Sequence, residues 1–262
     1  MPEFISSLQN PRVKQAVRLL GKASERKSQN LTVVEGEREI GLALRAGCRV
    51  QTLFVCRDVC GQPPGLAFPE DTIFEVSKAV FDKLAYRENS DGLIALIEPK
   101  KISLSEIKLS ANPFIIVLES VEKPGNLGAV LRTADAARVD AVLICDPQTD
   151  LYNPNVIRSS IGCLFSNQVA VCASDEAIRW LREKQIRSHA AALTATDFYH
   201  ETDFMQPSAI IMGTEAFGLS DKWLREADTQ IKIPMRGQID SLNVSASTAI
   251  LVFEVMRQRG FQ

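Results

Sequence analysis

The sequence has few metal-binding side chains. Its 262 residues include only two histidines, His189 and His200, and six cysteines. Cys56 and Cys60 form a close pair, but no second pair stands at the spacing of zinc ligands. We therefore expect no metal site. We also expect reduced, mostly buried thiols, which are typical of a large intracellular chain.

Long hydrophobic segments are also missing. No stretch approaches the roughly 20 apolar residues that cross a bilayer, and the first residues lack the basic flank and apolar run of a signal peptide. Hydrophobic residues make up 45% of the chain and charged residues 24%, which is ordinary for two modest domains or one large α/β domain. We expect a cytoplasmic protein.

Strong positive charge is absent as well. A net charge of -2 argues against nonspecific coating of nucleic acid, because that binding depends on many contacts to phosphates. Residues 1–30 differ from the rest, since six Lys or Arg and two acidic residues leave them at +4. The same segment fits a solvated amphipathic helix with Val13, Val17 and Leu20 facing inward. The two interpretations are compatible, and neither identifies a partner alone.

The lengths and spacing of the apolar segments predict two domains. Residues 31–97 indicate a small α/β layer with strands at 31–34, 52–56, 73–76 and 92–97 and helices at 37–46 and 78–85. The polar segment 98–113 interrupts this pattern with prolines, lysines and serines. We therefore predict a first domain at 1–105, with a basic N-terminal helix, and a second domain at 106–262.

The second domain has longer repeating units. We expect strands at 114–119, 141–145, 168–172, 189–193, 209–212 and 230–233, and helices at 126–138, 155–163, 175–184 and 243–259. Apolar strands that alternate with amphipathic helices indicate a parallel, doubly wound α/β sheet. Ligands of such sheets bind beyond the carboxyl ends of the strands, so the turns after Glu119, Met212 and Ile233 are the expected site.

The first turn leads into a helix that contains an arginine. Within Glu122–Ala134, Arg132 lies four residues after Gly128 and therefore on the same helix face. The missing side chain at Gly128 lets the guanidinium extend toward Asn126 and the helix N-terminus, where an anion is favoured. The alternative is an ordinary surface ion pair between Arg132 and Asp135.

The second turn, Gly213–Ser220, has the glycine spacing of a nucleotide-binding P-loop but lacks its lysine. Glu215 would repel phosphates, which argues against ATP or GTP, and the dinucleotide fingerprint that would support NAD or FAD is absent. We expect a less anionic ligand with a flat ring beside Gly213 and Gly218. The alternative is a plain loop in which Ser220 caps the next helix.

The third turn runs from Ile233 into a helix of small residues. Ser241 and Asn243 stand at the helix start, where they either cap the helix or face a pocket. For the core stripe of this helix we expect Ala246, Ala249, Ile250 and Phe253.

Together, the three turns resemble the SpoU (TrmH-type) RNA ribose methyltransferases of the SPOUT superfamily. The family's three motifs are similar to the segments 122–134, 210–220 and 233–249, in that order. The resemblance covers 114–262. The first domain is similar to the ribosomal-protein-like substrate-binding module that often precedes this catalytic domain, with Val34–Arg38 as its most recognisable piece.

The resemblance implies a deep trefoil knot made by the C-terminal helix, an obligate homodimer and S-adenosyl-L-methionine as the cofactor. For cofactor binding it implies backbone groups at Gly213, Ile233 and Leu242. Its implied reaction is methylation of a ribose 2'-hydroxyl in RNA, with ribosomal RNA favoured over transfer RNA by analogy with the first domain.

The resemblance also implies catalytic residues: Arg132, Asn126, Glu215, Ser241 and Asn243. Because arginine is almost always protonated, we favour a role for Arg132 in stabilising charge at the acceptor hydroxyl over the proposed role as base. Many relatives carry lysine where this chain has Asn155 and glycine where it has Ala216. Arg158 either holds an RNA phosphate or forms a surface ion pair.

Two alternatives remain open. An RNA-binding or scaffold protein could keep this fold without catalysis, and absence of cofactor binding would favour it. A small-molecule transferase is disfavoured by the basic N-terminal segment and the additional domain. His200, beside Glu201, lies away from the three turns, and we interpret it as a surface residue.

Overall fold

The computed structural model describes residues 2–60, 65, 68–86 and 90–261. The chain forms two compact units. Unit 1 comprises Met1–Lys100 and Asp150–Ser166, and unit 2 comprises Lys101–Thr149 and Asn167–Gln262. All six cysteines are free thiols, and four of them are buried, which confirms that expectation.

Unit 1 is a five-stranded mixed sheet with helices. The strand order is β1-β4-β3-β5-β2, in which β1, β4 and β3 are parallel and β5 is antiparallel to both neighbours. The strands are β1 (Glu3–Ile5), β2 (Thr32–Glu35), β3 (Arg49–Val55), β4 (Ile73–Val76) and β5 (Leu93–Glu98). The helices are α1 (Pro11–Gly21), α2 (Ala23–Gln29), α3 (Glu37–Arg45), α4 (Arg57–Cys60), α5 (Lys78–Leu84), α7 (Pro154–Ser159) and α8 (Cys163–Ser166). The expected α/β layer is confirmed.

The basic N-terminal segment forms two helices rather than one. Asn10 caps α1 by accepting a hydrogen bond from the backbone of Arg12, and α1 buries Val13, Ala16 and Leu19. This confirms an amphipathic helix and the inward position of Val13, whereas Val17 and Leu20 are only half-buried. Arg26 of α2 is only 5% exposed, so it does not belong to the solvated basic surface.

The segment Asp150–Ser166 packs with unit 1. Its predicted single helix is wrong, because left-handed backbone at Ile161 (φ 49°) and Gly162 (φ 83°) separates α7 from α8. The hydroxyl of Thr32 on β2 donates to the carbonyl of Tyr152 at 2.6 Å. This segment lies in sequence inside the second predicted domain, and the functional boundary near residue 105 stays a prediction.

Unit 2 is built on a seven-stranded sheet in which all neighbouring strands are parallel, in the order β10-β12-β9-β11-β6-β7-β8. The strands are β6 (Phe114–Glu119), β7 (Ala141–Cys145), β8 (Val169–Cys172), β9 (Arg187–Ala191), β10 (Asp197–Phe198), β11 (Ser208–Met212) and β12 (Thr229–Lys232). The longer helices are α6 (Pro124–Ala136), α9 (Ser174–Glu183), α10 (Asp221–Glu226) and α11 (Val244–Gln258). The predicted parallel α/β fold is confirmed.

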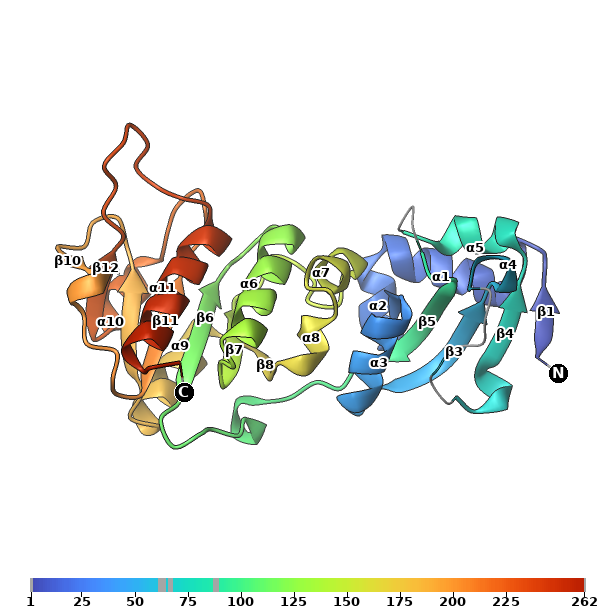
Figure 1. The fold of residues 1–262 in the computed structure, drawn as a ribbon, viewed down its shortest axis with the longest axis horizontal. Helices are drawn as coiled ribbons and strands as arrows, with labels where there is room; N and C mark the ends of the chain where they lie inside the picture. The colour runs from blue at the N-terminus through green and yellow to red at the C-terminus, as the bar shows by residue number, and fades with distance from the viewer. Residues whose placement is uncertain (1, 61–64, 66–67, 87–89, 262) are drawn as a thin grey trace. The chain divides into compact units, whose positions relative to one another are not determined.

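The C-terminal helix packs differently from the prediction. It contacts both α6 and β11, and α6 and α11 lie side by side (Figure 1). Its buried residues are Val244, Thr248, Leu251, Val252 and Val255. The stripe expected at Ala246 and Phe253 is wrong, because both residues are exposed and packing on two elements selects another helix face. The threading of this helix into a knot stays a prediction.

Candidate active site

The three predicted turns meet at the carboxyl edge of the unit 2 sheet. The strands β6 and β11 are hydrogen-bonded neighbours at its centre, and each ends at one of these turns (Figure 1). Glu215, in the turn after β11, accepts hydrogen bonds from the side chains of Lys123, Asn126 and Asn243. Residues from all three turns therefore share one carboxylate.

The two amides of this cluster have fixed donors and acceptors. Asn243 Nδ2 lies 2.7 Å from Glu215 Oε1 and 3.2 Å from Asn126 Oδ1. Asn243 Oδ1 accepts from the backbone N–H and the hydroxyl of Ser245, at 2.9 and 2.6 Å. Asn243 therefore caps α11, which confirms one of the two roles considered from the sequence, and it also joins the cluster. It lines neither of the two cavities described below.

Glu215 is held as a carboxylate. The hydrogen bond from Lys123 is the largest cause that lowers its pKa below the ordinary value, and Asn126 lowers it further. The same contact raises the pKa of Lys123. Because an ionised carboxylate only accepts hydrogen bonds, it orients the amide donors of both asparagines toward itself.

The backbone around Gly213 is too close for any other residue. A Cβ at Gly213 would lie 2.2 Å from the backbone of Gly218, and Thr214 and Gly218 exchange two backbone hydrogen bonds. Ser220, at the end of the loop, donates from its backbone and its hydroxyl to Glu119, at 2.8 and 2.6 Å. The side chain of Ser220 therefore anchors the loop to β6 and does not cap α10.

A cavity of about 510 Å³ lies on one side of this loop. The cofactor residues predicted from the sequence, Gly213, Ile233 and Leu242, all line it, and so does Ser241. Its wall also contains apolar side chains that are exposed to solvent, among them Leu193 (60%) and Phe217 (90%). A volume of this size suits a drug-sized or cofactor-sized ligand.

A smaller cavity of about 100 Å³ also borders the loop, and its lining includes Lys123, Asn126 and Val244. The segment Gly213–Ala216 lines both cavities. Glu215 therefore stands in a wall shared by a large cavity and a small one. This arrangement can hold two reactants next to each other.

Arg132 is the predicted catalytic residue that neither joins the cluster nor lines either cavity. It lies near the middle of α6, exposed, and forms no hydrogen bond or ion pair with any residue that the structure describes. The alternative ion pair with Asp135 is therefore not formed. Gly128, one turn before it, is buried, and the reach of the guanidinium over that position stays a prediction.

Sequence reasoning missed Lys123 and the turn after β9. Lys123 is the N-cap of α6, where a cation faces the positive end of the helix dipole, and this unusual placement was a usable signal. Ala191, the last residue of β9, and the three residues after it line the large cavity. They carry no glycine motif, although their position at a carboxyl strand end could have identified them.

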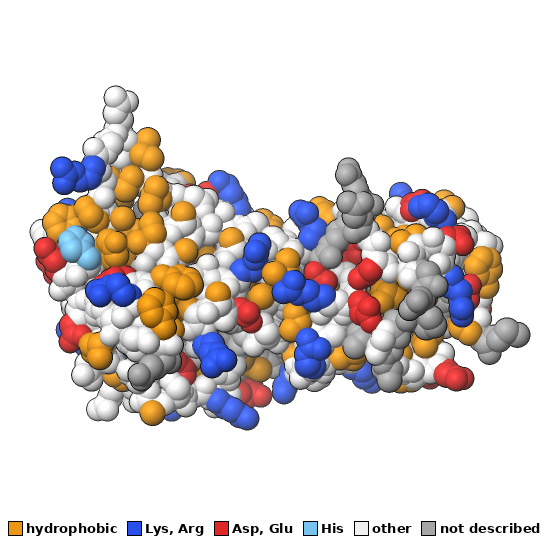
Figure 2. Space-filling model, in the orientation of Figure 1, with side chains coloured by type: hydrophobic (Ala, Val, Ile, Leu, Met, Phe, Trp, Pro, Cys, Tyr) orange, Lys and Arg blue, Asp and Glu red, His pale blue; other side chains and the backbone are white. Residues whose placement is uncertain are grey.

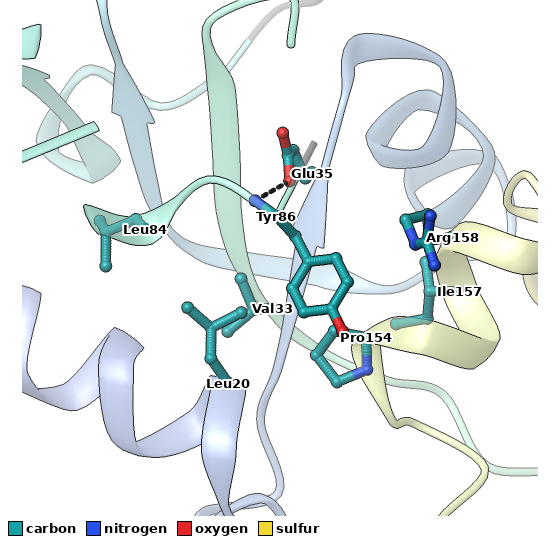
Figure 3. Close-up of a pocket in the computed structure, with 8 residues that line it drawn as sticks. All are labelled: Leu20, Val33, Glu35, Leu84, Tyr86, Pro154, Ile157 and Arg158. Carbon is teal, nitrogen blue, oxygen red and sulfur yellow. Dashed lines mark hydrogen bonds between the residues drawn. The ribbon is translucent and has the colours of Figure 1, made fainter. Parts of the chain in front are cut away.

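Arg158 and His200 lie outside the cluster. Arg158 of α7 is exposed, and its guanidinium carbon is 5.3 Å from the centre of the Tyr86 ring (Figure 3). Both residues border a hollow of about 10 Å³ in unit 1, which has room for about one water molecule beside the buried Oε1 of Glu35. His200 is 49% exposed in its side chain and lies 4.0 Å from Glu201, as expected for a surface residue.

Comparisons with known proteins agree with this geometry. Residues 113–253 match the SpoU rRNA methylase family, and residues 10–95 match the MRM3-like substrate binding domain. A 23S rRNA (guanosine-2'-O-)-methyltransferase of Pasteurella multocida is 35% identical over 72% of this chain and 80% of its own length.

Two solved structures are similar over almost the whole chain. The crystal structure of an RNA 2'-O ribose methyltransferase is 41% identical, with a TM-score of 0.81, and covers 98% of this chain and 99% of its own. An AdoMet-bound rRNA methyltransferase from Sinorhizobium meliloti is 28% identical, with a TM-score of 0.87, and covers 97% of each chain. The motifs, the fold and these likenesses together show that the chain belongs to the SpoU rRNA methylase family.

Proposed function

We propose that this protein transfers a methyl group from S-adenosyl-L-methionine to a ribose 2'-hydroxyl of 23S ribosomal RNA. The enzyme class, an RNA 2'-O-methyltransferase, and the cofactor expected from the sequence are confirmed by the family membership and by an AdoMet-bound relative. The observation that carries the proposal for this chain is the pair of cavities that share the wall Gly213–Ala216.

The large cavity fits S-adenosyl-L-methionine. Gly213 allows the backbone to approach a flat ring, and the apolar side chains Leu193 and Leu242 offer surface to it. The acidic residues Glu215 and Asp240 line the same cavity, which suits a ligand with a sulfonium cation. When bound, the cofactor supplies an electrophilic methyl group. Gly213, Ile233 and Leu242 are the residues we propose to hold it.

The small cavity fits the acceptor ribose. Asn126 and Glu215 offer hydrogen bonds to a sugar hydroxyl there, and Asn243 fixes the orientation of both. We propose that Arg132 lies beside the acceptor hydroxyl and its phosphate and stabilises the negative charge that develops when the hydroxyl loses its proton. Ser241, whose hydroxyl bonds Asp240 at 3.1 Å, is proposed to contact the cofactor side.

The test is transfer of labelled methyl groups to 23S rRNA fragments by the wild-type protein and by Arg132→Ala. Loss of a single group that stabilises developing charge lowers kcat by about 10²–10³-fold. Arg138→Ala, which changes an arginine beyond the end of α6, is the matched control and should keep normal transfer. Near-normal transfer by Arg132→Ala would refute its role, and absence of S-adenosyl-L-methionine binding by calorimetry would refute the enzyme.

Further proposals concern assembly and location. We propose a homodimer, supported by three exposed apolar side chains: Phe253 (43%) within α11, Phe261 (64%) after its end and Met205 (51%). Figure 2 shows hydrophobic side chains gathered over α11 and the loop before it. Sedimentation that gives only monomers at micromolar concentration would refute the dimer. A cytoplasmic site of action is also proposed; among the described residues, no helix has the length and apolar character to cross a bilayer.

A further inference from the structure

Lys123 has an unusual place in the fold. It is the N-cap residue of α6, with extended backbone (φ -84°, ψ 121°), and its side chain makes no capping hydrogen bond. N-cap positions favour Ser, Thr, Asp or Asn, and a cation there opposes the helix dipole. This local cost indicates that the side chain serves another purpose.

The partner of the Lys123 side chain, Glu215, indicates this purpose. Lys123 Nζ donates to Glu215 Oε2, while Asn126 and Asn243 donate to the other oxygen, Oε1. The ammonium therefore occupies one oxygen and leaves the second to the two amides. Lys123 is 69% exposed in its side chain, so this ion pair contributes little to folding.

The position of Glu215 controls the shape of both cavities. Glu215 lines the large cavity and the small one, and its neighbours Gly213 and Ala216 do the same. A carboxylate that turned away would release Asn126 and Asn243, and a protonated one would be a weaker acceptor for them and would no longer attract Lys123. Any group that fixes Glu215 therefore fixes the relative placement of the two reactants.

We propose that Lys123 is a positioning residue of the methyl-transfer site, which ties the first turn to the second by holding Glu215 in the wall between the two cavities. This inference rests on the proposed function. Lys123 lines the small cavity, but the role proposed here is exerted through its bond to Glu215.

The charged groups around Glu215 are few. Lys123 and Glu122 come from the first turn and line the small cavity, and Lys232 and Asp240 line the large one. Lys123 is the charged group that bonds Glu215 directly, and its loss raises the pKa of Glu215 toward the ordinary value. Glu215 would then be protonated at higher pH, so activity that needs the carboxylate should fall off earlier on acidification.

The experiment compares Lys123→Met, Lys123→Arg and a matched control, Lys222→Met. Lys222 also pairs with a carboxylate of unit 2, Asp175 at 2.8 Å, but lies in α10 and lines neither cavity. We expect Lys123→Met to lower kcat/KM for S-adenosyl-L-methionine about tenfold, below the roughly 10²-fold cost of a 1 Å displacement. Lys123→Arg should recover most of the loss, and Lys222→Met should match wild type.

The pH dependence is the decisive readout. The acidic limb of kcat/KM should move to higher pH in Lys123→Met and return in Lys123→Arg. Unchanged limbs, equal losses in Lys123→Met and Lys222→Met, or an effect of Lys123→Met on RNA affinity alone would overturn the proposal. The last result would identify Lys123 as a phosphate ligand instead.

A second readout does not depend on activity. The side-chain carboxyl resonance of Glu215, assigned by its disappearance in Glu215→Gln, reports its titration in protein labelled with ¹³C at glutamate. The midpoint should rise in Lys123→Met, and an unmoved midpoint would overturn the proposal even if the enzyme is inactive. If wild type transfers no methyl group and binds no cofactor while the midpoint still shifts, the proposed function fails and the contact of Lys123 with Glu215 stands.

Discussion

Arg26 in unit 1 and Glu215 in unit 2 are both charged side chains with partners far along the chain, but they differ in burial. Arg26 is 5% exposed and pairs with Asp150 at 2.6 Å. Glu215 is 27% exposed in its side chain and pairs with Lys123, which is 69% exposed. Removal of one partner from a buried ion pair strongly destabilises the fold, because it leaves an unpaired charge. An exposed pair contributes little to stability and can rearrange around a ligand. The first is therefore suited to stability and the second to chemistry.

The other contacts of Arg26 and Glu215 differ in the same way. Arg26 Nη1 also donates to the carbonyl of Leu19, at 2.6 Å, so its guanidinium is bound by protein groups. Its pair ties α2 to the segment that precedes α7 within unit 1. Glu215 instead borders two cavities that are open to reactants.

The largest expected effect comes from breaking the buried pair. Arg26→Ala leaves Asp150, whose side chain is only 11% exposed, without its cation, which should lower the free energy of unfolding by about 3 kcal/mol. The measurement is urea denaturation followed by circular dichroism. The exposed pair of Arg49 and Glu98 is the matched control, and Arg49→Ala should change stability by less than about 1 kcal/mol.

A double variant sharpens this prediction. Arg26→Met with Asp150→Leu removes both charges together and should recover most of the stability that Arg26→Ala loses, because no unpaired charge remains. If Arg26→Ala and Arg49→Ala were equally stable, burial would not distinguish these two ion pairs, and the comparison above would fail.

A second effect tests a buried group of unit 2 that has no charge. His189 is 1% exposed, and its Nδ1 lies 2.7 Å from the hydroxyl of Thr229. Burial, followed by the nearby cation of Arg187, lowers its pKa from 6.5 to about 4. The folded protein therefore keeps His189 neutral, and the unfolded chain binds a proton there more readily.

The sign of the pH effect follows directly. Because the pKa is lower in the folded state, stability is complete above about pH 6.5 and declines as the pH falls toward 4. By pH 5 the loss should be about 2 kcal/mol relative to pH 7. Urea unfolding at both pH values measures it. His189→Gln cannot titrate, so the stability that it loses between pH 7 and pH 5 should be about 2 kcal/mol smaller than the wild-type loss. An equal loss in both proteins would contradict the lowered pKa of His189.

Local patterns explain why much of the sheet could be predicted from the sequence. The predicted bounds of β4, β6 and β7 are confirmed. Every residue of β6 and β7 is buried, so these strands need almost continuous apolar residues, whereas β4 alternates buried and half-buried residues. The strands β1 and β10 were missed, since three or two residues carry too little pattern. The cavity residue Gly213 was found because close backbone approach requires glycine, which is a local signal.

Contacts between distant residues could not be predicted in the same way. Arg26 looked like part of a solvated basic face because its partner, Asp150, follows 124 residues later. Lys123 was missed for the same reason, with Glu215 lying 92 residues on. In both cases the sequence around the cation does not show which carboxylate it pairs with. The partner lies in a distant segment, and the burial of the pair then indicates whether it serves stability or the site.

The smallest expected effect concerns an exposed cation in unit 1, the unit that holds the buried Arg26. Arg158 is exposed near the Tyr86 ring, and its guanidinium donates a hydrogen bond to the amide oxygen of Asn155, at 3.4 Å. We propose that it contacts an RNA phosphate. Arg158→Ala should then weaken binding of a 23S rRNA fragment by about threefold and reduce the salt-dependence slope by about one.

Fluorescence anisotropy at several salt concentrations measures both quantities. Arg49→Ala is again the control, because Glu98 already neutralises that guanidinium and its removal should leave the slope unchanged. A slope unaffected by Arg158→Ala would mean that this arginine, although exposed, contacts no phosphate. Exposure alone would then not be sufficient for a charged residue to act on RNA. The difference between buried and exposed charges would need a further condition, namely that the exposed charge borders a cavity large enough for a reactant. Glu215 meets this condition.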